Sequence, residues 1–263
     1  MKYYLSIDAG TSVIKTVIFS QDFKMKFKSS IENKVQTNSK GKSEINMNSF
    51  WSLTSKLVKN SLKKSKIKNI NIIGVGITGN MVGVWPVNTK GKSVRNAILW
   101  NDARSKEIFD KIQINNPNIY QNIFDLTGSI VQFGCTIPVI KWLEKNEPQT
   151  IKKTDYFLTC KDWIRLNLTN EFNNDHTERA VAPGDIKKAD LSLKIFKLLK
   201  LNKKYLNKFP QVKKSQDIAG YITDKAAKET GLLSGTPVIV GLGDVPASAV
   251  GVGAIHNNQT STI

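Results

Sequence analysis

The amino-terminal part of the chain shows the hydrophobic spacing of β-strands. Apolar residues alternate with polar ones or run together over residues 3–7, 13–19 and 23–31, which is the pattern of strands with at least one buried face. Small and polar residues separate these segments at residues 8–12 and 21–22. The pattern predicts three strands joined by short turns, as in an antiparallel meander.

A helix and a further strand follow the meander. Residues 47–65 place Phe50, Leu57 and Leu62 at helical spacing, so this helix should cover one face of the sheet. Residues 70–78, INIIGVGIT, form a short and mostly apolar run, which is typical of a buried parallel strand. Meander, crossover helix and buried strand together predict a mixed sheet in an α/β domain.

The rest of the chain alternates helical patterns with a few more strands. Strands are expected at residues 81–88 and 97–101, and a mostly helical region from about Ser105 to about residue 208. Apolar residues recur at helical spacing in three segments of that region, residues 137–146, 161–169 and 191–201. The last of these is basic and amphipathic, and we favour a helix that faces the core over one that lies on a membrane. The end of the chain predicts a helix, a buried strand at residues 237–243 and a helix that begins at or just after Asp244.

Two of the predicted strands end on an acidic residue close to glycine. These acids are Asp8 in SIDAGTS and Asp244 in VIVGLGDVPASA. An acid at the carboxyl end of a buried strand in an α/β sheet lies where such folds bind ligands. Each acid taken alone is equally well explained as a helix cap or a turn former.

The loop after Asp8 consists of small residues. Gly10 permits unusual backbone dihedral angles, and Thr11 and Ser12 offer hydroxyl and amide groups that can bind phosphate oxygens. Lys15, on the following strand, adds a cation nearby. The loop therefore has the composition of a phosphate site, although short turns of Gly, Thr and Ser are common.

Length and composition indicate an ordinary folded protein. The 263 residues are 40% hydrophobic, which is enough for a sizeable core. No apolar run approaches the roughly 20 residues of a membrane span, and the first residues resemble a strand rather than a signal peptide, so we expect a cytoplasmic protein. Cys135, Cys160, His176 and His256 fall in no recognisable metal or catalytic spacing, and we interpret both cysteines as free thiols.

The net charge of +18 raises the alternative of a nucleic-acid-binding protein, because clustered cations bind phosphate backbones. Only four of the 39 basic residues are arginines, and the lysines are spread over much of the chain. Nucleic-acid sites generally use arginine and stacked aromatic residues as well. We therefore favour a lysine-rich solvated surface.

Six motifs, taken together, resemble those of a known family. They are DAGTSVIK at residues 8–15, GITGNMVGV at 76–84, ILWNDARS at 98–105, GCTIPVIKWL at 134–143, CKDWIRLNLTNEF at 160–172 and GTPVIVGLGDVPASAVGVGA at 235–254. In order and spacing the chain resembles the FGGY family of carbohydrate kinases from its first residue to its last. It is more similar to xylulokinases and L-xylulose kinases than to glycerol kinases, because Asn80 and Met81 stand where glycerol kinases carry an Arg-Glu pair. The resemblance implies an α/β, ribonuclease H-like fold of the actin, hexokinase and Hsp70 superfamily, with a mixed sheet and flanking helices.

The resemblance also implies catalytic roles. Asp244 matches the catalytic base, which accepts the proton of the attacking sugar hydroxyl. Asp8 matches the acid that holds Mg²⁺, the metal that accompanies ATP in this family. Gly10, Thr11, Ser12 and Lys15 fall in the phosphate-binding loop. The implied reaction is the ATP-dependent phosphorylation of a sugar or polyol hydroxyl, with a pentulose-like substrate.

The implied sugar pocket adds further residues to Asp244. They are Asn80, Met81, Trp100, Asn101, Asp102 and Arg104. The Trp100 ring would face C–H groups of the sugar, while amide and carboxylate groups bind its hydroxyls. Without the resemblance, Trp100 would be interpreted as a core aromatic and Arg104 as a surface cation. Two positions depart from the pattern: Val82 replaces the His of D-xylulose kinases, and Val245 replaces a Gln or Asn found in many members.

The chain is also shorter than the proteins it resembles. Members of the family have two domains of related fold, whereas this chain stops at HNNQTSTI, where the second half would begin. We therefore interpret residues 1–263 as the amino-terminal domain that binds sugar and carries the catalytic base, and we expect the carboxyl-terminal nucleotide-binding domain to be absent. An alternative function is a non-catalytic carbohydrate-binding module. An apolar face left without its second domain is expected to pair with a separate half or to form a homodimer.

Overall fold

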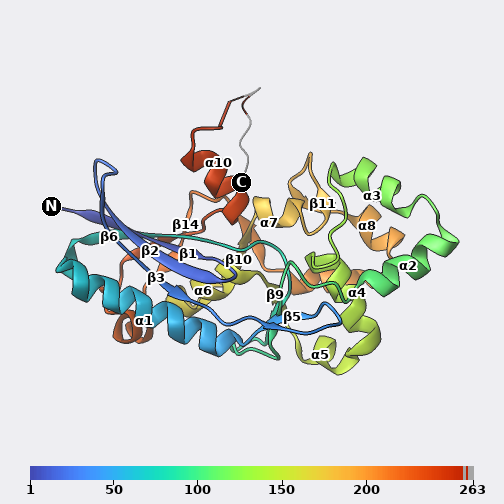
Figure 1. Ribbon diagram of the computed structural model, residues 1–263, viewed down its shortest axis with the longest axis horizontal. Helices are drawn as coiled ribbons and strands as arrows, with labels where there is room; N and C mark the ends of the chain where they lie inside the picture. The colour runs from blue at the N-terminus through green and yellow to red at the C-terminus, as the bar shows by residue number, and fades with distance from the viewer. Residues whose placement is uncertain (257–258, 260–263) are drawn as a thin grey trace.

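A six-stranded mixed sheet forms the centre of the fold in the computed structural model, which describes residues 1–256 and 259 (Figure 1). Its strands, in spatial order, are β14 (Ile218–Tyr221), β15 (Pro237–Ile239), β6 (Ile72–Gly79), β1 (Tyr3–Ala9), β2 (Val13–Ser20) and β3 (Met25–Glu32). Strands β1, β2 and β3 pair antiparallel, and β6 lies parallel to both β1 and β15. The meander and the buried parallel strand predicted from the sequence are thus confirmed.

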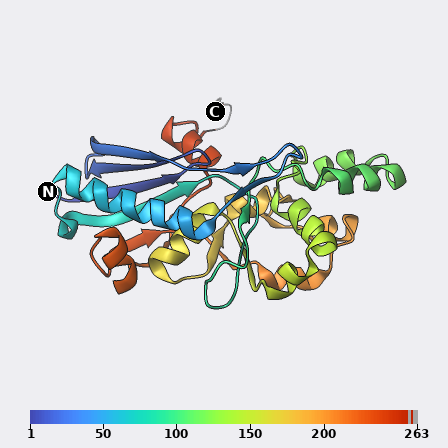
Figure 2. The same cartoon turned by 60° about the horizontal axis from the view of Figure 1, so that its bottom comes forward.

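Three helices cover one face of this sheet. They are α1 (Met47–Ser65), α6 (Cys160–Thr169) and α9 (Asp224–Thr230). Figure 2 shows α1, in cyan, lying along the strands. Its apolar stripe buries Phe50, Leu57 and Leu62, as the helical spacing predicts, and the indole nitrogen of Trp163 on α6 donates to the Met47 carbonyl at 3.0 Å.

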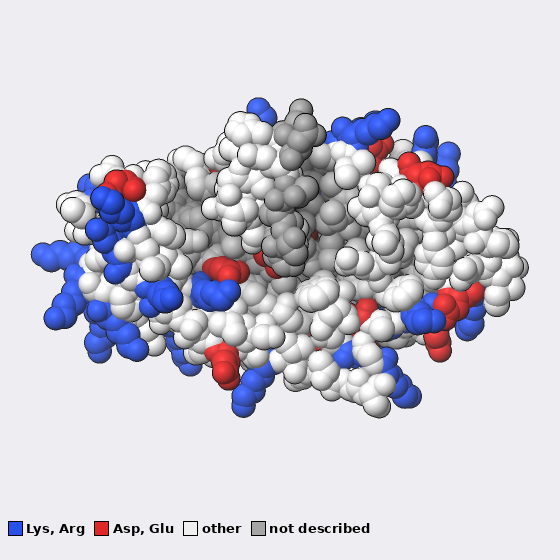
Figure 3. All heavy atoms as spheres, turned by 45° about the horizontal axis from the view of Figure 1, so that its top comes forward, with Lys and Arg blue, Asp and Glu red and all other residues white. Residues whose placement is uncertain are grey.

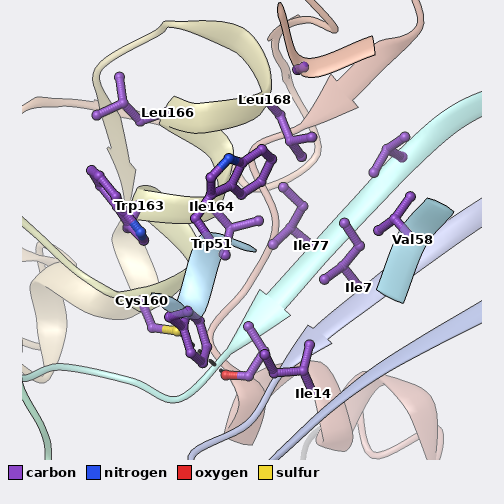
Figure 4. Packing of buried hydrophobic residues seen from close by; sticks show 14 of the residues in the cluster. Ile7, Ile14, Trp51, Val58, Ile77, Cys160, Trp163, Ile164, Leu166 and Leu168 are labelled. Atoms are coloured by element: carbon purple, nitrogen blue, oxygen red, sulfur yellow. Dashed lines mark hydrogen bonds between the residues drawn. The ribbon is translucent and has the colours of Figure 1, made fainter. Parts of the chain in front are cut away.

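The main hydrophobic core lies between these helices and the sheet. Figure 4 shows Ile7, Ile14 and Ile77, from β1, β2 and β6, directed toward side chains such as Val58 of α1 and Ile164 of α6. All five residues are almost completely buried. At about 1.5–3 kcal/mol for each fully buried large apolar side chain, this layer accounts for much of the hydrophobic stabilisation.

The opposite face of the sheet is more open. Leu5 and Ile7 of β1 are fully buried, whereas Ser6 and Asp8, which alternate with them, remain partly exposed. The helix on this side is α10 (Asp244–Gly251), which contacts β6 and has no fully buried residue. The period-two alternation of β1 therefore presents Asp8 on the open face.

A second, mainly helical part adjoins one end of the sheet (Figure 1). Its helices are α2 (Lys106–Asn115), α3 (Ile119–Thr127), α4 (Thr136–Asn146), α5 (Pro148–Lys153), α7 (His176–Ala180) and α8 (Leu193–Leu198). A 3₁₀ turn, η2 (Lys203–Lys208), also lies in this part, whereas η1 (Asn69–Asn71) directly precedes β6 of the main sheet. A separate core here includes Phe109, Ile140 and Phe196.

Nine further short strands lie in the part of the chain that the structure describes. They are β4 (Gln36–Thr37), β5 (Ser43–Ile45), β7 (Trp85–Val87), β8 (Ala97–Ile98), β9 (Tyr156–Leu158), β10 (Asn173–Asp175), β11 (Gly184–Asp185), β12 (Asp190–Leu191) and β13 (Gln211–Lys213). Strands β7 and β9 pair with each other, as do β10 and β13. These small sheets join the helical part to the main sheet.

Some predicted elements are shorter than expected. The strand expected at residues 237–243 ends at Ile239, because Gly241 adopts a positive φ of 82° and the chain turns there against the Ile77 carbonyl. The strand expected at 81–88 is reduced to β7, and the helix expected at 191–201 to α8. Ile195 and Phe196 of α8 are buried, so that helix faces the core. Most of the segment HNNQTSTI lies outside the described residues.

Candidate active site

The hairpin between β1 and β2 carries Asp8 and the small-residue loop. Asp8 faces Lys15 across the hairpin, and the Lys15 ammonium lies 3.1 Å from the Asp8 carboxylate. Asn33, just after β3, donates from its side-chain amide to the Thr11 carbonyl at 2.8 Å and from its backbone N–H to the Ser12 carbonyl at 2.8 Å. The loop is therefore held from the β3 side, with Asp8 and Lys15 both accessible.

Asp244 is the first residue of α10, and its loop is anchored to β6 and α7. The Thr78 hydroxyl donates to the Leu242 carbonyl at 2.9 Å. The Gly243 N–H donates to the Thr177 hydroxyl at 3.1 Å. Burial raises the pKa of the Asp244 carboxyl, and the negative charge of Asp8 raises it further. The two acids predicted from their positions at strand ends are thus close enough to interact.

Asp244 borders a cavity of about 540 Å³. That volume lies within the ~300–1,000 Å³ range of small-molecule sites. The side chains that line it come from the segments that follow β6 and β8, from α7 and the residue after it, from α10 and from the segment between α3 and α4: Met81, Val82, Trp100, Ser129, Ile130, Gln132, Cys135, Thr177, Ala180, Val181, Asp244, Val245 and Pro246. Three of these side chains, Met81, Trp100 and Asp244, are among the predicted substrate contacts. Val82 and Val245 are the two positions that depart from the motif pattern.

Trp100 connects the cavity to the hairpin loop. Its indole N–H donates to the Thr11 hydroxyl at 2.9 Å, and its side chain is 44% exposed. Trp100 is therefore not an ordinary core aromatic. The cavity, the loop and both acids belong to one continuous site.

The structure places Asn80 and Asn101 outside the cavity lining. Asn80 is buried, and its backbone N–H and side-chain amide both donate to the Ala9 carbonyl, at 3.1 and 3.0 Å. Asn101 is exposed. In this geometry Asn80 fixes the end of β1 next to Met81.

Asp102 and Arg104 also lie outside the lining, in a buried ion-pair network. The Asp102 carboxylate accepts from the Ser43 N–H at 2.6 Å and from the Arg104 guanidinium at 2.8 Å. Arg104 also bonds to Glu44 at 2.6 Å and lies over the Trp142 ring at 4.9 Å from its centroid. Arg104 is thus not a surface cation. The network supports the backbone that carries Trp100.

A second buried ionic cluster lies beneath the cavity, and the sequence analysis did not identify it. It consists of Lys161, Asp162, Arg165, Asp175 and Glu178. We call this set the buried cluster; its side chains are almost completely inaccessible to solvent. The sequence reads DHTERA around Glu178, a pattern that looks like an exposed polar turn.

The buried cluster supports two walls of the cavity. Glu178 accepts a hydrogen bond at 2.8 Å from the N–H of Val82, a residue that adopts a positive φ of 52°. Asp175 accepts a hydrogen bond from the Thr177 hydroxyl, which in turn accepts from the Gly243 N–H. The backbone on both sides of the cavity is therefore tied to the same group of charges.

The buried cluster holds three carboxylates and two cations, and this imbalance is reflected in the titration of Glu178. Burial raises the pKa of Glu178 to about 7. The charge of Lys161 opposes this rise, and the negative charges of Asp162 and Asp175 add to it. Lys161 and Arg165 offset the burial of Asp162 and hold its pKa at about 2. Glu178 is thus the acid of the cluster that titrates near neutral pH.

We expect Glu178→Gln to change how stability depends on pH. The folded wild type keeps a proton on Glu178 up to about pH 7, whereas the unfolded chain loses it near the ordinary value of 4.5. The free energy of unfolding therefore falls as pH rises from about 4.5 to about 7, by a few kcal/mol. Glutamine still accepts from the Val82 N–H but does not ionise, so urea unfolding between pH 5 and pH 8 should lack this decline.

The exposed Glu171 provides a matched control for this prediction. Glu171→Gln should leave the wild-type pH dependence unchanged. Parallel stability curves for wild type and Glu178→Gln would contradict the assignment of a raised pKa to Glu178.

The remaining candidate residues show no metal or catalytic arrangement. Within residues 1–256 and 259, no three His, Cys, Asp or Glu side chains gather as a metal site. His176 is hydrogen-bonded through Nδ1 to the Ala189 carbonyl at 2.8 Å. Both cysteines are free and buried, and burial raises the pKa of Cys135 to about 12. Among the described helices, none is long and apolar enough to cross a bilayer.

The basic side chains do not surround the site. Figure 3 shows Lys and Arg gathered at one end of the face and scattered along its rim. The hollowed centre of that face carries mainly uncharged side chains. This distribution favours the lysine-rich solvated surface over a continuous track for nucleic acid.

Comparisons with known proteins agree on one family. Residues 3–251 match the model of the FGGY family of carbohydrate kinases, N-terminal domain. The chain is 28% identical to a probable L-xylulose kinase of Haemophilus influenzae, over 95% of this chain and 51% of that protein. It is 29% identical to the xylulose kinase of Bacillus subtilis, over 99% and 51%.

The fold is shared with solved structures. The ligand-bound xylulose kinase from Lactobacillus acidophilus superposes with a TM-score of 0.86 at 21% identity, over 97% of this chain and 51% of that chain. The sheet and helices therefore have the actin- and hexokinase-like fold that the sequence motifs imply. The chain spans about half the length of the curated relatives it matches. It belongs to the FGGY family of carbohydrate kinases and corresponds to the N-terminal domain of that family.

Proposed function

We propose that the chain takes part in the ATP-dependent phosphorylation of a hydroxyl on a sugar or polyol, with Asp244 as the general base. The observation that carries this proposal is the position of Asp244. It lies at the cavity wall, close enough to Asp8 for the charges to interact, and its pKa is raised. A carboxylate of this kind accepts a proton from a bound hydroxyl more readily than an ordinary one.

The hairpin loop would hold the phosphates of ATP. Gly10, Thr11 and Ser12 present small side chains and backbone amides beside Asp8, and Lys15 adds a cation 3.1 Å from the Asp8 carboxylate. Asp8 is accessible and repels Asp244, which fits a site for Mg²⁺ held by one carboxylate, water and phosphate oxygens. When bound, Mg²⁺ would neutralise charge on the phosphates. Asp244 would then orient the hydroxyl and take its proton in an in-line transfer.

Met81, Trp100 and Asp244 would contact the sugar, since they line the cavity. Asn80, Asn101, Asp102 and Arg104 were also expected in the pocket, and in our proposal Asn80, Asp102 and Arg104 shape it from behind. The matched relatives named xylulose kinase and L-xylulose kinase support a pentulose-like substrate.

The exposed helix α10 supports a role for a second domain. Val245 and Val250 of α10 are each 54% exposed, although the helix is almost wholly apolar. The chain covers about half of its relatives, so we propose that α10 and the open face of the sheet dock a nucleotide-binding domain. If a second copy of the chain covered this face instead of the nucleotide-binding domain, light scattering would give the mass of a dimer.

A coupled ATP-consumption assay with Mg²⁺ and a panel of pentuloses and pentitols tests the function. We expect sugar-dependent turnover when a nucleotide-binding domain is docked on α10. Absence of turnover under that condition, with a sugar still raising the melting temperature, would favour the second candidate, a non-catalytic carbohydrate-binding module. Absence of both turnover and stabilisation would contradict the proposed function.

A further inference from the structure

The wall of the cavity around Asp244 is largely apolar. Seven of its side chains are aliphatic or thioether groups: Met81, Val82, Ile130, Ala180, Val181, Val245 and Pro246. Ile130 is 82% exposed and Val245 is 54% exposed, so a bound ligand would cover a large apolar surface. Such a wall gains most from contact with C–H groups.

Most polar groups of the lining already have partners. The Thr177 hydroxyl bonds to Asp175 and to the Gly243 N–H, and the Trp100 N–H donates to Thr11. Burial keeps the Cys135 thiol protonated, with a pKa of about 12. Asp244, Ser129 and Gln132 remain as the described lining side chains that can bind ligand hydroxyls.

This composition is poorly matched to a sugar with a hydroxyl on every carbon. Each hydroxyl placed against the valines, Ile130 or Pro246 would lose hydrogen bonds to water without replacement. A methyl group in the same place would bury apolar surface instead. One small group in an apolar pocket typically changes selectivity by about 10- to 200-fold.

We propose that the cavity takes a terminal-deoxy ketose or the corresponding deoxy polyol, with its methyl end against the apolar wall and a hydroxyl against Asp244. The inference rests on the proposed function for the identity of the reacting group. It adds the substrate class: a sugar with one CH₃ end rather than two CH₂OH ends.

Matched pairs of ketoses test the proposal with the 263-residue chain. The pairs are 1-deoxy- and 5-deoxyxylulose against xylulose, and 6-deoxyfructose against fructose, in both enantiomers. Titration calorimetry measures the affinities, supported by the change in tryptophan fluorescence, to which Trp100 contributes at the cavity wall. We expect at least one deoxy ketose to bind about tenfold or more tightly than its parent.

Two variants on α10 locate the source of the preference. Val245→Thr adds a hydroxyl to the cavity wall at nearly constant volume and should reduce the preference at least threefold. Val250→Thr is the control, because Val250 is equally exposed at 54% but does not line the cavity; it should leave the preference unchanged. Both sites are exposed, so neither variant should impair folding.

Several results would overturn the inference. The parent ketoses could bind as tightly as their deoxy partners, or no ketose of the pairs could bind at all. The preference for the deoxy ketose could also persist in Val245→Thr. A separate measurement of phosphoryl transfer tells whether the proposed substrate class or the proposed function is wrong. If fully hydroxylated ketoses were phosphorylated as well as deoxy ketoses, only the proposed substrate class would be wrong. If deoxy ketoses bound selectively but were not phosphorylated, the proposed reaction would be wrong and the apolar binding preference of the cavity would stand.

Discussion

Replacing Asp244 by Asn should lower sugar-dependent ATP turnover at least a hundredfold, with sugar binding retained. Asparagine keeps the size of the side chain at the start of α10 but cannot accept a proton from the substrate hydroxyl. General-base catalysis typically contributes about 10²- to 10⁴-fold. The loop itself is held by Thr78 and Thr177, through hydrogen bonds to Leu242 and Gly243, so the variant should fold. The coupled assay and calorimetry with the same sugar measure the two effects.

Asp224→Asn is the matched control. Asp224 is the first residue of α9, as Asp244 is of α10, and it bonds to Ser234 rather than facing the cavity. Its replacement should leave turnover near the wild-type rate. Equal activity of Asp244→Asn and wild type would exclude Asp244 as the base.

Replacing Lys161 by Met should destabilise the fold by about 3–5 kcal/mol at neutral pH. Lys161 is fully buried and lies 3.2 Å from Asp162 and 3.6 Å from Glu178, with Asp175 as a third partner. Its loss leaves Asp162 and Asp175 with Arg165 as the one remaining cation of the cluster, and it makes Glu178 still harder to ionise. Such a loss is a large share of a typical total stability of about 5–15 kcal/mol. Urea unfolding followed by circular dichroism measures it.

Two companions sharpen this test. Lys106→Met removes a surface lysine that is paired with Asp110 and should barely move the unfolding midpoint. Adding Glu178→Gln to Lys161→Met removes the cost of keeping Glu178 protonated without Lys161 and should recover part of the lost stability. If Lys161→Met unfolded at the wild-type urea concentration, the cluster would not be the support described above.

Local pattern was sufficient to predict the centre of the fold. The alternation in β1 and the spacing in α1 reflect burial on one face, which neighbouring residues in the sequence already encode. The edge strand β14 was not predicted, because its four residues carry little apolar periodicity. The end of β15 was placed too late, since the turn at Gly241 depends on contact with Ile77, which is distant in sequence.

The same limit applies to the site. Asp8 lies near the end of β1 and Asp244 begins the helix that follows β15, so the local pattern was enough to single them out. The bond from Arg104 to Glu44 and the bond from the Ser43 N–H to Asp102 join residues far apart in sequence, and no local pattern shows them. Glu178 was missed for the same reason, because its burial arises from contacts with Lys161 and Val82.

The position of the buried cluster bears on how substrate preference can change during evolution. Glu178 and Asp175 hold the backbone of the cavity walls, while side chains such as Val245 and Ile130 only face the cavity. Exposed positions of that kind tolerate replacement at little cost in stability, whereas members of a buried charge network do not. Exchange of wall residues one at a time can therefore change what the cavity binds, provided that the buried cluster is kept.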